Sequence, residues 1–429
     1  MTTLTTDAPA SSAEPDIQIA KHWRAPLTLA AIALISLGFF GLGTGSGLRT
    51  SFSVSRSTDF FRISTFDMPS RATAVIASAL ALALAAYSAW CVHSGRKARW
   101  WVPVLFGVAT MTALLAWAGA GKGDTDIQIT GLLTGAVVLS VPLVFGALAG
   151  TLCERSGVIN IAIEGQLLFG AFLGAVMASA TGNPYVGLLF APVAGALVGA
   201  LLALFAVRYW VDQIVVGVVL NVLVIGITNF LFGTLLRDNP DLNQSISLPS
   251  LPIPGLSGIP VIGPVLFDHT ALVYLMYVIV AVMNVMLFKS RWGLRVRAVG
   301  EHPKAADTVG IKVNRTRVRN TILGGAIAGL GGAFFTVASS LAFGKEMTSG
   351  KGFIALAAMI LGRWSPKGAL AAALLFGFAD SLKDQLGIVG SAIPSEFLAM
   401  TPYLATIFAV AGFVGHARPP AAEGKPYKK

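Results

Sequence analysis

Charged residues are scarce in this chain. They make up 12% of its 429 residues, whereas a soluble domain carries roughly 25%. Hydrophobic residues make up 55%, and the mean hydropathy is +0.74. This composition excludes a soluble globular protein and predicts an all-α, polytopic membrane protein. The 47 glycines suit close helix packing in lipid.

Cysteine and histidine are also rare. The two cysteines, Cys91 and Cys153, fall near expected helix ends and imply no disulfide framework. The five histidines form no metal-ligand spacing, so we expect no metal site.

The sequence lacks the motifs of a nucleotide-binding enzyme. The string 119–123 (GAGKG) has neither the spacing of a phosphate-binding loop nor the Ser or Thr that follows its Lys. The glycine-alternating run 41–47 follows a helix instead of a strand, so it is no dinucleotide site. No Ser-His-Asp or Cys-His arrangement stands out. We therefore expect no catalytic residue, no cofactor in this chain and no enzymatic activity of its own.

Long apolar stretches predict about 11–12 transmembrane segments, because roughly 20 apolar residues cross a bilayer as a helix. A further apolar piece, 353–362, is too short for a straight span. The expected spans are 26–43, 72–92, 102–120, 129–150, 158–181, 187–207, 214–236, 271–288, 320–341, 368–386 and 399–415.

The net charge of +11 lies mainly in loops and termini beside these spans. Positively charged loops stay on the cytoplasmic side, so we expect membrane lipids and no nucleic acid as partners of this charge. The loop 289–319 holds nine bases and two acids, a formal charge of +7, and is expected inside. The loop 237–268 carries a charge of −2 and six prolines, and is expected outside. The loop 44–71 opposes the rule, because it carries four Arg residues yet falls outside.

The short segment 353–362 decides the side of the carboxy-terminal tail. If it crosses as a short helix, both termini are cytoplasmic. If it re-enters, the basic tail lies outside. The charge of the tail favours crossing.

The stretch 154–166 places polar residues between two apolar spans. Asn160 and Glu164 lie four residues apart, which puts them on one face of a helix. A carboxylate inside a span is costly unless it has a partner or a wet cavity. The stretch therefore either lines a pore or gate, or forms a structural polar cluster with Glu164 bonded to Asn160 or to a neighbouring helix. Asn221 either faces the same interior or joins helices, and Ser349 marks a second polar break.

The basic loop 289–319 has internal order. Pro303 and Gly310 frame the segment PKAADTVG, with Pro where a helix begins and Gly where it ends. This pattern predicts a small helix on the cytoplasmic face. It is either a solvated loop that fixes topology or a surface gripped by a motor or regulator.

Three strings, in order, resemble the permease subunits of bacterial ABC importers of the branched-chain amino acid, ribose and nucleoside permease family. They are ERSGVINIAIEGQLLFGAF (154–172), GLRVRAVGEHPKAADTVGIKV (293–313) and GKGFIALAAMILGRWSPKGALAAALLFGF (350–378). The nucleoside or simple-sugar branch is the most similar, and the resemblance covers about 129–415. Together with the composition and the predicted spans, it divides the chain into four expected parts: a disordered cytoplasmic tail (1–25), an extension of three transmembrane helices (26–128) that lies outside the resemblance, the ABC permease core (129–415) and a second cytoplasmic tail (416–429).

The resemblance also implies a coupling helix in the loop 289–319 that contacts the ATP-binding subunit. The residues implied for this contact are Gly300, Glu301, Ala305, Ala306 and Gly310. Lys304 departs from the pattern, since a glutamate stands there in many importers.

The implied assembly contains an ATP-binding subunit that holds ATP and Mg²⁺, a second and different permease chain, and an extracytoplasmic substrate-binding protein. Its expected location is the bacterial cytoplasmic (inner) membrane. The substrate pathway would involve Asn160, Glu164, Asn221 and Ser349.

The function implied is a channel-forming permease for nucleosides or simple sugars. The alternative is a secondary transporter driven by an ion gradient, with Glu164 as its proton-coupling carboxylate.

Overall fold

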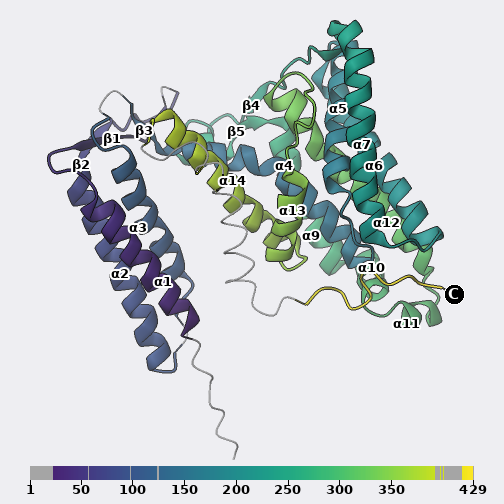
Figure 1. Cartoon of the computed structure of the whole chain (residues 1–429), viewed down its shortest axis with the longest axis horizontal. Helices are drawn as coiled ribbons and strands as arrows, with labels where there is room; N and C mark the ends of the chain where they lie inside the picture. The colour runs from purple at the N-terminus through teal and green to yellow at the C-terminus, as the bar shows by residue number, and fades with distance from the viewer. Residues whose placement is uncertain are drawn as a thin grey trace, which may run out of the picture. The chain divides into compact units, whose positions relative to one another are not determined.

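The computed structural model describes residues 23–56, 58–96, 98–122, 125–391, 397, 400 and 418–428. The chain packs as two units, both drawn in Figure 1. The first is built from the ranges 1–50 and 67–123, and the second from 51–66 and 124–429.

Three long helices make up the first unit. They are α1 (Arg24–Ile35, continued by a π-helical turn, Ser36–Leu42), α2 (Ser70–His93) and α3 (Trp101–Ala118). The helices pack side by side, and Ser36 and Ser78 share a buried hydrogen bond of 2.9 Å between their hydroxyl groups. All three match the predicted spans to within two residues.

The second unit holds most of the helices. They are α4 (Ile129–Arg155), α5 (Ile163–Thr181), α6 (Pro184–Ala203), α7 (Gln213–Leu231), α8 (Ile262–Leu266), α9 (Ala271–Lys289), α10 (Arg291–Glu301), α11 (Pro303–Thr308), α12 (Val313–Ala333), α13 (Lys351–Leu361) and α14 (Pro366–Ile388). Three of them, α6, α7 and α12, continue as π-helical turns to Arg208, Leu236 and Ser339.

The strands are short. They are β1 (Arg49–Ser53), β2 (Phe66–Pro69), β3 (Ile127–Gln128), β4 (Ser250–Pro252) and β5 (Asp268–Thr270). Strand β1 pairs in parallel with β3 through Phe52 and Ile127, and β4 pairs antiparallel with β5. The proline-rich loop 237–268 contains β4, a 3-10 turn (Pro240–Asn243) and the five-residue α8, so it is a structured loop as predicted.

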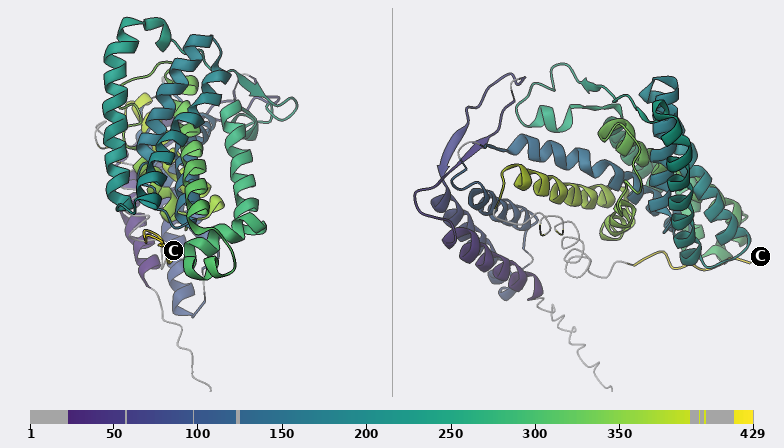
Figure 2. Two further views of the ribbon diagram at one scale, coloured as in Figure 1. Left: turned by 90° about the vertical axis from the view of Figure 1, so that its right-hand side faces the viewer. Right: turned by 45° about the horizontal axis from the view of Figure 1, so that its top comes forward.

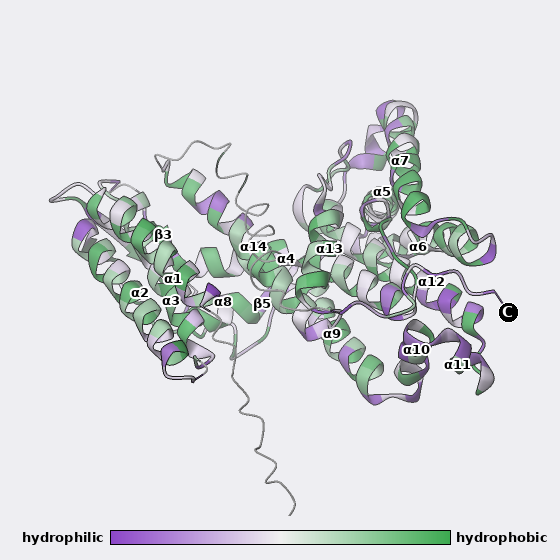
Figure 3. Ribbon diagram, turned by 60° about the horizontal axis from the view of Figure 1, so that its bottom comes forward, coloured by the Kyte–Doolittle hydropathy of each residue, from purple (hydrophilic) through white to green (hydrophobic). Residues whose placement is uncertain are grey.

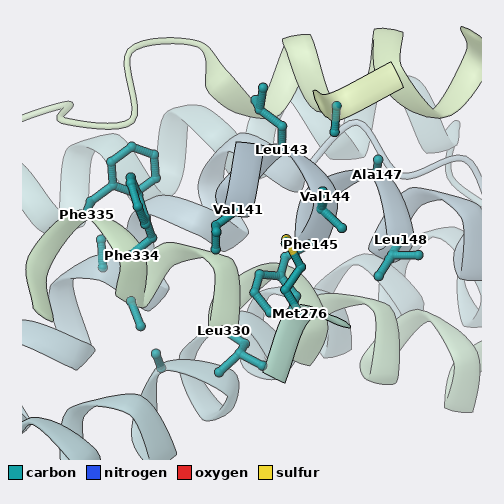
Figure 4. Close-up of a cluster of buried hydrophobic side chains, with 14 of the residues drawn as sticks. Val141, Leu143, Val144, Phe145, Ala147, Leu148, Met276, Leu330, Phe334 and Phe335 are labelled. Carbon is teal, nitrogen blue, oxygen red and sulfur yellow. The ribbon is translucent and has the colours of Figure 1, made fainter. Parts of the chain in front are cut away.

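Helices α4 and α12 form the centre of the second unit. Helix α4 packs against α12, α13 and α14, while α12 also packs against α5 and α6. Figure 4 shows Val141 and Phe145 of α4 near Leu330 of α12 and Met276 of α9, all buried. Inside a bilayer such contacts stabilise the bundle through close packing, because lipid tails are as apolar as the side chains.

Glycines bring α6 and α12 almost into backbone contact. A Cβ on Gly195 would lie 2.1 Å from the carbonyl oxygen of Gly325, and a Cβ on Gly329 would lie 2.4 Å from that of Ala191. The glycines on these two helices therefore mark a helix interface.

Helices α4 and α14 run antiparallel through the full thickness of the unit. At one end, the Ser381 hydroxyl of α14 donates to the carbonyl of Leu132, 2.8 Å away. At the other end, Nε of Arg155 donates to the carbonyl of Trp364, 2.9 Å away, just before α14 begins. The right-hand view of Figure 2 shows the two helices side by side.

The segment containing α13 connects the loop 237–268 with the Arg155 end of α4. Asp268 of that loop lies near the Ile129 end of α4, because it pairs with Arg56 at 3.7 Å and Arg56 donates to Thr134 at 3.3 Å. The same loop holds Phe343, whose carbonyl accepts from Asn243 at 3.0 Å. Trp364 lies at the Arg155 end of α4, and whether this segment crosses the membrane stays a prediction.

The helices depart from the predicted spans by five residues or more in three places, and one of them is the end of α4, at Arg155 instead of 150. Helix α5 begins at Ile163, so the prediction that helix continues back to 158 is wrong. The chain leaves α4 with Gly157 at φ +90°, a conformation that favours glycine, and residues 158–162 stay non-helical. Helix α12 begins at Val313, about two turns before the predicted span. The predicted span 399–415 lies outside the described residues, apart from residue 400.

Nine helices among the described residues are long and apolar enough to cross a membrane. Six of these, α4, α5, α6, α7, α9 and α12, belong to the second unit. Figure 3 shows hydrophobic colouring along them and hydrophilic colouring on α10 and α11. The chain is therefore an integral, multi-pass, all-α membrane protein.

Candidate functional site

Two interrupted segments meet inside the second unit. One is the buried, non-helical stretch 156–162 followed by α5, and the other is the loop 340–350 followed by α13. The start of α13 lies against the start of α5, while the turn after α13 lies against the inner end of α4. Helix α13 has 11 residues, about 16 Å at roughly 1.5 Å per residue, so the two helices begin well inside the unit. Paired interruptions of this kind are characteristic of transport pathways.

Glu164 of α5 caps the start of α13. Its carboxylate accepts hydrogen bonds from the Thr348 hydroxyl (2.6 Å) and from the backbone N–H groups of Gly350 (2.8 Å) and Gly352 (2.6 Å). A helix start carries unpaired N–H groups and a partial positive charge, both of which a carboxylate satisfies. The Glu164 side chain is 6% exposed, so the expectation that it faces the protein interior is correct.

Close approach at this point requires glycine. A Cβ on Gly352 would lie 2.5 Å from the backbone nitrogen of Glu164, well inside normal contact. Without a side chain there, α13 can bring its N–H groups within reach of the carboxylate.

Asn221 of α7 caps the start of α5 in the same way. Its Oδ1 accepts from the backbone N–H of Gly165 at 2.8 Å, and its Nδ2 donates to the carbonyl of Ile161 at 2.9 Å. Gln213, at the start of α7, accepts from the backbone N–H of Ile159 at 2.7 Å. Side chains from α7 thus satisfy the backbone of the stretch 156–162 and hold it in place.

The expectation that Asn160 shares a helical face with Glu164 is wrong. Asn160 precedes the first residue of α5, so helical spacing does not apply to it. Its Nδ2 donates to Oε1 of Gln166 at 3.0 Å and contacts Sγ of Cys153 at 3.6 Å. Of the two structural alternatives for Glu164, the bond to a neighbouring helix is the one observed.

Ser349 lies next to the cap but is exposed, with φ +45° and its hydroxyl donating to the Glu346 carbonyl at 3.3 Å. The structure therefore brings together Glu164, Asn221 and the loop that carries Ser349, while Asn160 connects to them through α5. A role of these four residues in a substrate pathway stays a prediction.

Sequence analysis missed the residues that lie where the turn after α13 meets the end of α4. The Trp364 indole N–H donates to the buried carboxyl group of Glu154, and Arg155 holds the Trp364 carbonyl. These contacts fasten the turn after α13 to the end of α4. The ERSG string gives the only local signal for them, since Trp364 lies more than 200 residues away in the sequence.

A buried ion pair crosses from α13 to α14. Nζ of Lys351 pairs with a carboxylate oxygen of Asp380, whose side chain is only 5% exposed. Lys383, one turn after Asp380 on the same helix, pairs instead with the exposed Asp384 at 3.4 Å. Among the residues that the structure describes, no group of three or more His, Cys, Asp or Glu side chains could hold a metal ion.

The predicted small helix in the loop 289–319 is present as α11, preceded by α10. Gly310 has φ +85° and ends α11, as its place in the sequence indicated. Ala306 is 3% exposed and packs against Val299 and Val313, whereas Ala305 faces solvent. The Ala306 side chain therefore packs inside the loop 289–319 and is not part of its exposed surface.

Gly300 and Glu301 lie at the end of α10. A Cβ on Gly300 would lie 2.2 Å from the Arg155 carbonyl oxygen, so α10 touches the inner end of α4 there. Beyond α11, Val309 is 75% exposed. The same loop carries four further exposed basic residues: Lys304, Lys312, Arg315 and Arg319. Contact of these residues with an ATP-binding subunit stays a prediction.

Known proteins resemble the chain over this same region. Residues 132–414 match the family described as branched-chain amino acid transport system / permease component. The guanosine ABC transporter permease protein NupQ of Bacillus subtilis is 39% identical over 71% of this chain and 98% of its own length. No solved structure matches the chain.

Two further relatives extend the comparison. The nucleoside ABC transporter permease protein NupC of Lactococcus lactis is 39% identical over 68% of this chain and 95% of its own length. The putative glucose ABC transporter permease protein TsgC13 of Haloferax volcanii is 35% identical over 59% and 77%. The broken helices, the basic loop 289–319 and this match all point the same way: the chain belongs to the branched-chain amino acid transport system permease family, as a permease subunit of an ABC importer.

Proposed function

We propose that this permease subunit imports nucleosides, with simple sugars as the second candidate. The observation that carries the proposal is the 39% identity to NupQ and NupC, whose names specify guanosine and nucleosides. The relative named for glucose matches less of the chain at 35% identity. Beside the charged groups already paired within the protein, the broken helices carry buried neutral hydrogen-bonding side chains, which suit an uncharged polar solute: Asn160, Gln166, Asn221 and Thr348.

The proposed assembly has four kinds of component. ATP and Mg²⁺ bind to a separate ATP-binding subunit that docks on α10 and α11. A second permease, a different chain, completes the channel, and an extracytoplasmic binding protein delivers the solute. The complex lies in the bacterial cytoplasmic membrane with both termini inside, in agreement with the basic loop 289–319.

In this proposal, α5, α7 and α13 form the gate of the channel, which opens and closes as they move relative to one another. Glu164 holds α13 against α5, and Asn221 holds α5 against α7, through the polar contacts described above. ATP-driven movement of α10 reaches α4 through the contact at Gly300. Such movement shifts the population between outward-open and inward-open arrangements of the broken segments.

The contacts of Glu164 support a structural role over proton transport. Three donors already occupy its carboxylate, and two of them are backbone N–H groups that cannot rotate away. A proton-carrying group must gain and lose a proton as the transporter cycles. Protonation here would remove an acceptor from the start of α13.

Transport by purified protein in lipid vesicles tests the proposal. We expect uptake of labelled guanosine that requires the ATP-binding subunit and ATP, and that unlabelled nucleosides but not glucose inhibit. Inhibition by glucose alone would favour the sugar alternative. Uptake by the lone chain under a pH gradient, without ATP, would replace the importer with a secondary transporter.

A further inference from the structure

The carboxy-terminal segment 418–428, which we call the strap, lies across the inner face of the second unit. It appears in yellow beside α10 and α11 in Figure 1. The strap is neither helix nor strand, yet its backbone is held at several points by hydrogen bonds to α10 and α12. A basic tail that served only to fix topology would need no such contacts.

Arg317 of α12 depends on the strap for its partners. Its side chain is fully buried, and its Nη1 and Nη2 donate to the carbonyls of Lys425 (2.7 Å) and Ala422 (3.4 Å). A buried guanidinium without acceptors is strongly unfavourable. The strap therefore completes the environment of a charge that belongs to a membrane-spanning helix.

The strap also binds the end of α10. The N–H of Ala422 donates to the Gly300 carbonyl at 2.9 Å, and the N–H of Ala421 donates to the Glu301 carboxylate at 3.2 Å. Tyr427 packs on the cluster of Val299, Ala306 and Val313, which supports α11 from below. The same eleven residues thus contact both helices of the coupling loop.

A third set of contacts reaches the broken segment. The carboxyl group of Glu423 lies beside that of Glu154 at the end of α4. The backbone of Gly424 lies so close to Ile159 that an added Cβ would be 2.9 Å from its side chain. The strap therefore touches the stretch 156–162, which positions α5.

We propose that the strap is a positioning element of the transport cycle, which joins α10 and α11 to α12 and to the stretch 156–162. Arg317 acts through it as a positioning residue. When α10 and α11 move, the strap moves with them and carries the displacement to the inner ends of α4 and α12. The inference rests on the proposed function in one respect, namely that α10 and α11 form the coupling loop.

The first test measures how many solute molecules enter per ATP hydrolysed, in the full complex. Arg317→Met removes the donors but keeps most of the volume, so we expect this ratio to fall about five-fold or more while ATP hydrolysis continues. Arg317→Lys keeps a donor and should recover part of the ratio. Arg237→Met changes an exposed Arg in the loop 237–268, outside the loop 289–319, and serves as the control.

The second test replaces the strap. A chain in which a Gly/Ser linker of equal length replaces 418–428 should show the same loss as Arg317→Met. An unchanged ratio of uptake to hydrolysis in both variants would overturn the proposal. A loss in Arg317→Met alone would assign Arg317 to the packing of α12 and would equally remove the strap from the mechanism.

A double-mutant cycle on the purified permease tests docking without reference to any solute. Arg317→Met and the linker replacement remove the same contacts, so their effects on thermal unfolding should not add. Additive effects would mean that Arg317 and the strap do not interact. This result is independent of the proposed function, which the absence of ATP-driven guanosine uptake by the unmodified complex would contradict separately.

A cross-link decides whether the strap travels with the coupling loop or must release it. Ile311 and Tyr427 belong to one apolar cluster, so Ile311→Cys with Tyr427→Cys can be joined by a short bifunctional reagent. We expect the joined protein to transport as well as the same variant before joining. Arrest on joining, reversed on cleavage, would show an inhibitory flap and would contradict the proposal.

Discussion

Glu164 has more donors than a neutral amide can serve. Its carboxylate accepts from Thr348, Gly350 and Gly352, whereas glutamine offers one oxygen and turns an NH₂ group toward a donor. We expect Glu164→Gln to lower the free energy of unfolding by about 1–3 kcal/mol, and Glu164→Leu to lower it further. Thermal unfolding in detergent measures both, and Glu346→Gln on the exposed loop is the control. Equal stability of Glu164→Gln and the natural protein would show that the charge of the Glu164 cap does not stabilise the fold.

Glu423 should make docking of the strap depend on pH. Burial raises the pKa of Glu423, beside Glu154 of α4 and the strap carbonyls bound to Arg317 of α12. The docked state therefore favours the protonated acid. Docking is strongest below the ordinary pKa of glutamic acid and weakens as pH rises through the raised value.

Protection of the carboxy terminus from carboxypeptidase reports this dependence. We expect faster digestion at mildly alkaline than at mildly acidic pH, after correction for the enzyme's own pH profile on a free peptide. Glu423→Gln should remove the difference and leave the strap docked at both values. A difference that persists in Glu423→Gln belongs to another group.

The start of α13 depends on backbone contact as well as on charge. In Gly352→Ala the new methyl group would overlap the backbone of Glu164, so α13 must move away from its cap. We expect a clear loss of stability and of ATP-driven uptake. Gly387→Ala, near the end of α14 with open space around its Cβ position, should gain up to about 1 kcal/mol from helix propensity. Similar melting temperatures for the two variants would contradict the close approach.

The ion pair of Lys351 and Asp380 joins α13 to α14. Removing one partner leaves a buried charge unpaired, so Lys351→Met should lower the free energy of unfolding by about 3–5 kcal/mol. The double variant with Asp380→Leu should recover part of this loss. Lys383→Met breaks only an exposed pair, worth about 0–1 kcal/mol, and provides the comparison. If both single variants lose the same amount, the buried pair has no special role.

The elements show where sequence patterns suffice and where they do not. Apolar length located the spans of α1, α2, α3 and α9 almost to the residue, because each is a continuous helix in lipid. The start of α5 was misplaced, because the run VINIA is as apolar as a helix. Its non-helical form depends on Gln213 and Asn221, which lie some 50 residues further along the chain. The partners of Glu164 were missed for the same reason, since Gly350 and Gly352 lie nearly 190 residues away.

The coupling loop shows the same limit. Pro303 and Gly310 are local signals, and they predicted α11 correctly. Tyr427 packs on the cluster that buries Ala306, and the buried Arg317 donates to carbonyls of the strap. No local pattern in the basic tail indicates such contacts. From the sequence, the charge of the tail predicts only the side of the membrane on which it lies.

The two loops predicted to lie outside the membrane, 44–71 and 237–268, contact each other. Arg56 belongs to the loop 44–71, which opposed the charge rule, and it pairs with Asp268 of the acidic loop 237–268. Part of the excess positive charge of the first loop is therefore balanced by the second. The boundaries between tails, extension and core stay a prediction, and the packing adds that residues 51–66 belong with the second unit.

Single cysteines can report the orientation of the whole chain. Ser250 and Thr308 are exposed, whereas the natural Cys91 and Cys153 are buried and should react little. In intact cells we expect a membrane-impermeant maleimide to label Ser250→Cys and to spare Thr308→Cys until the membrane is opened. Labelling of Thr308→Cys from outside would invert the topology.

The docked strap also affects how the protein can be handled. An affinity tag or fluorescent protein joined to the strap would lie next to α10 and α11, where the ATP-binding subunit is proposed to dock. Such a fusion would report normal amounts of protein in the membrane while competing with its motor. Expression screens and localisation studies of this permease should therefore keep labels away from the strap.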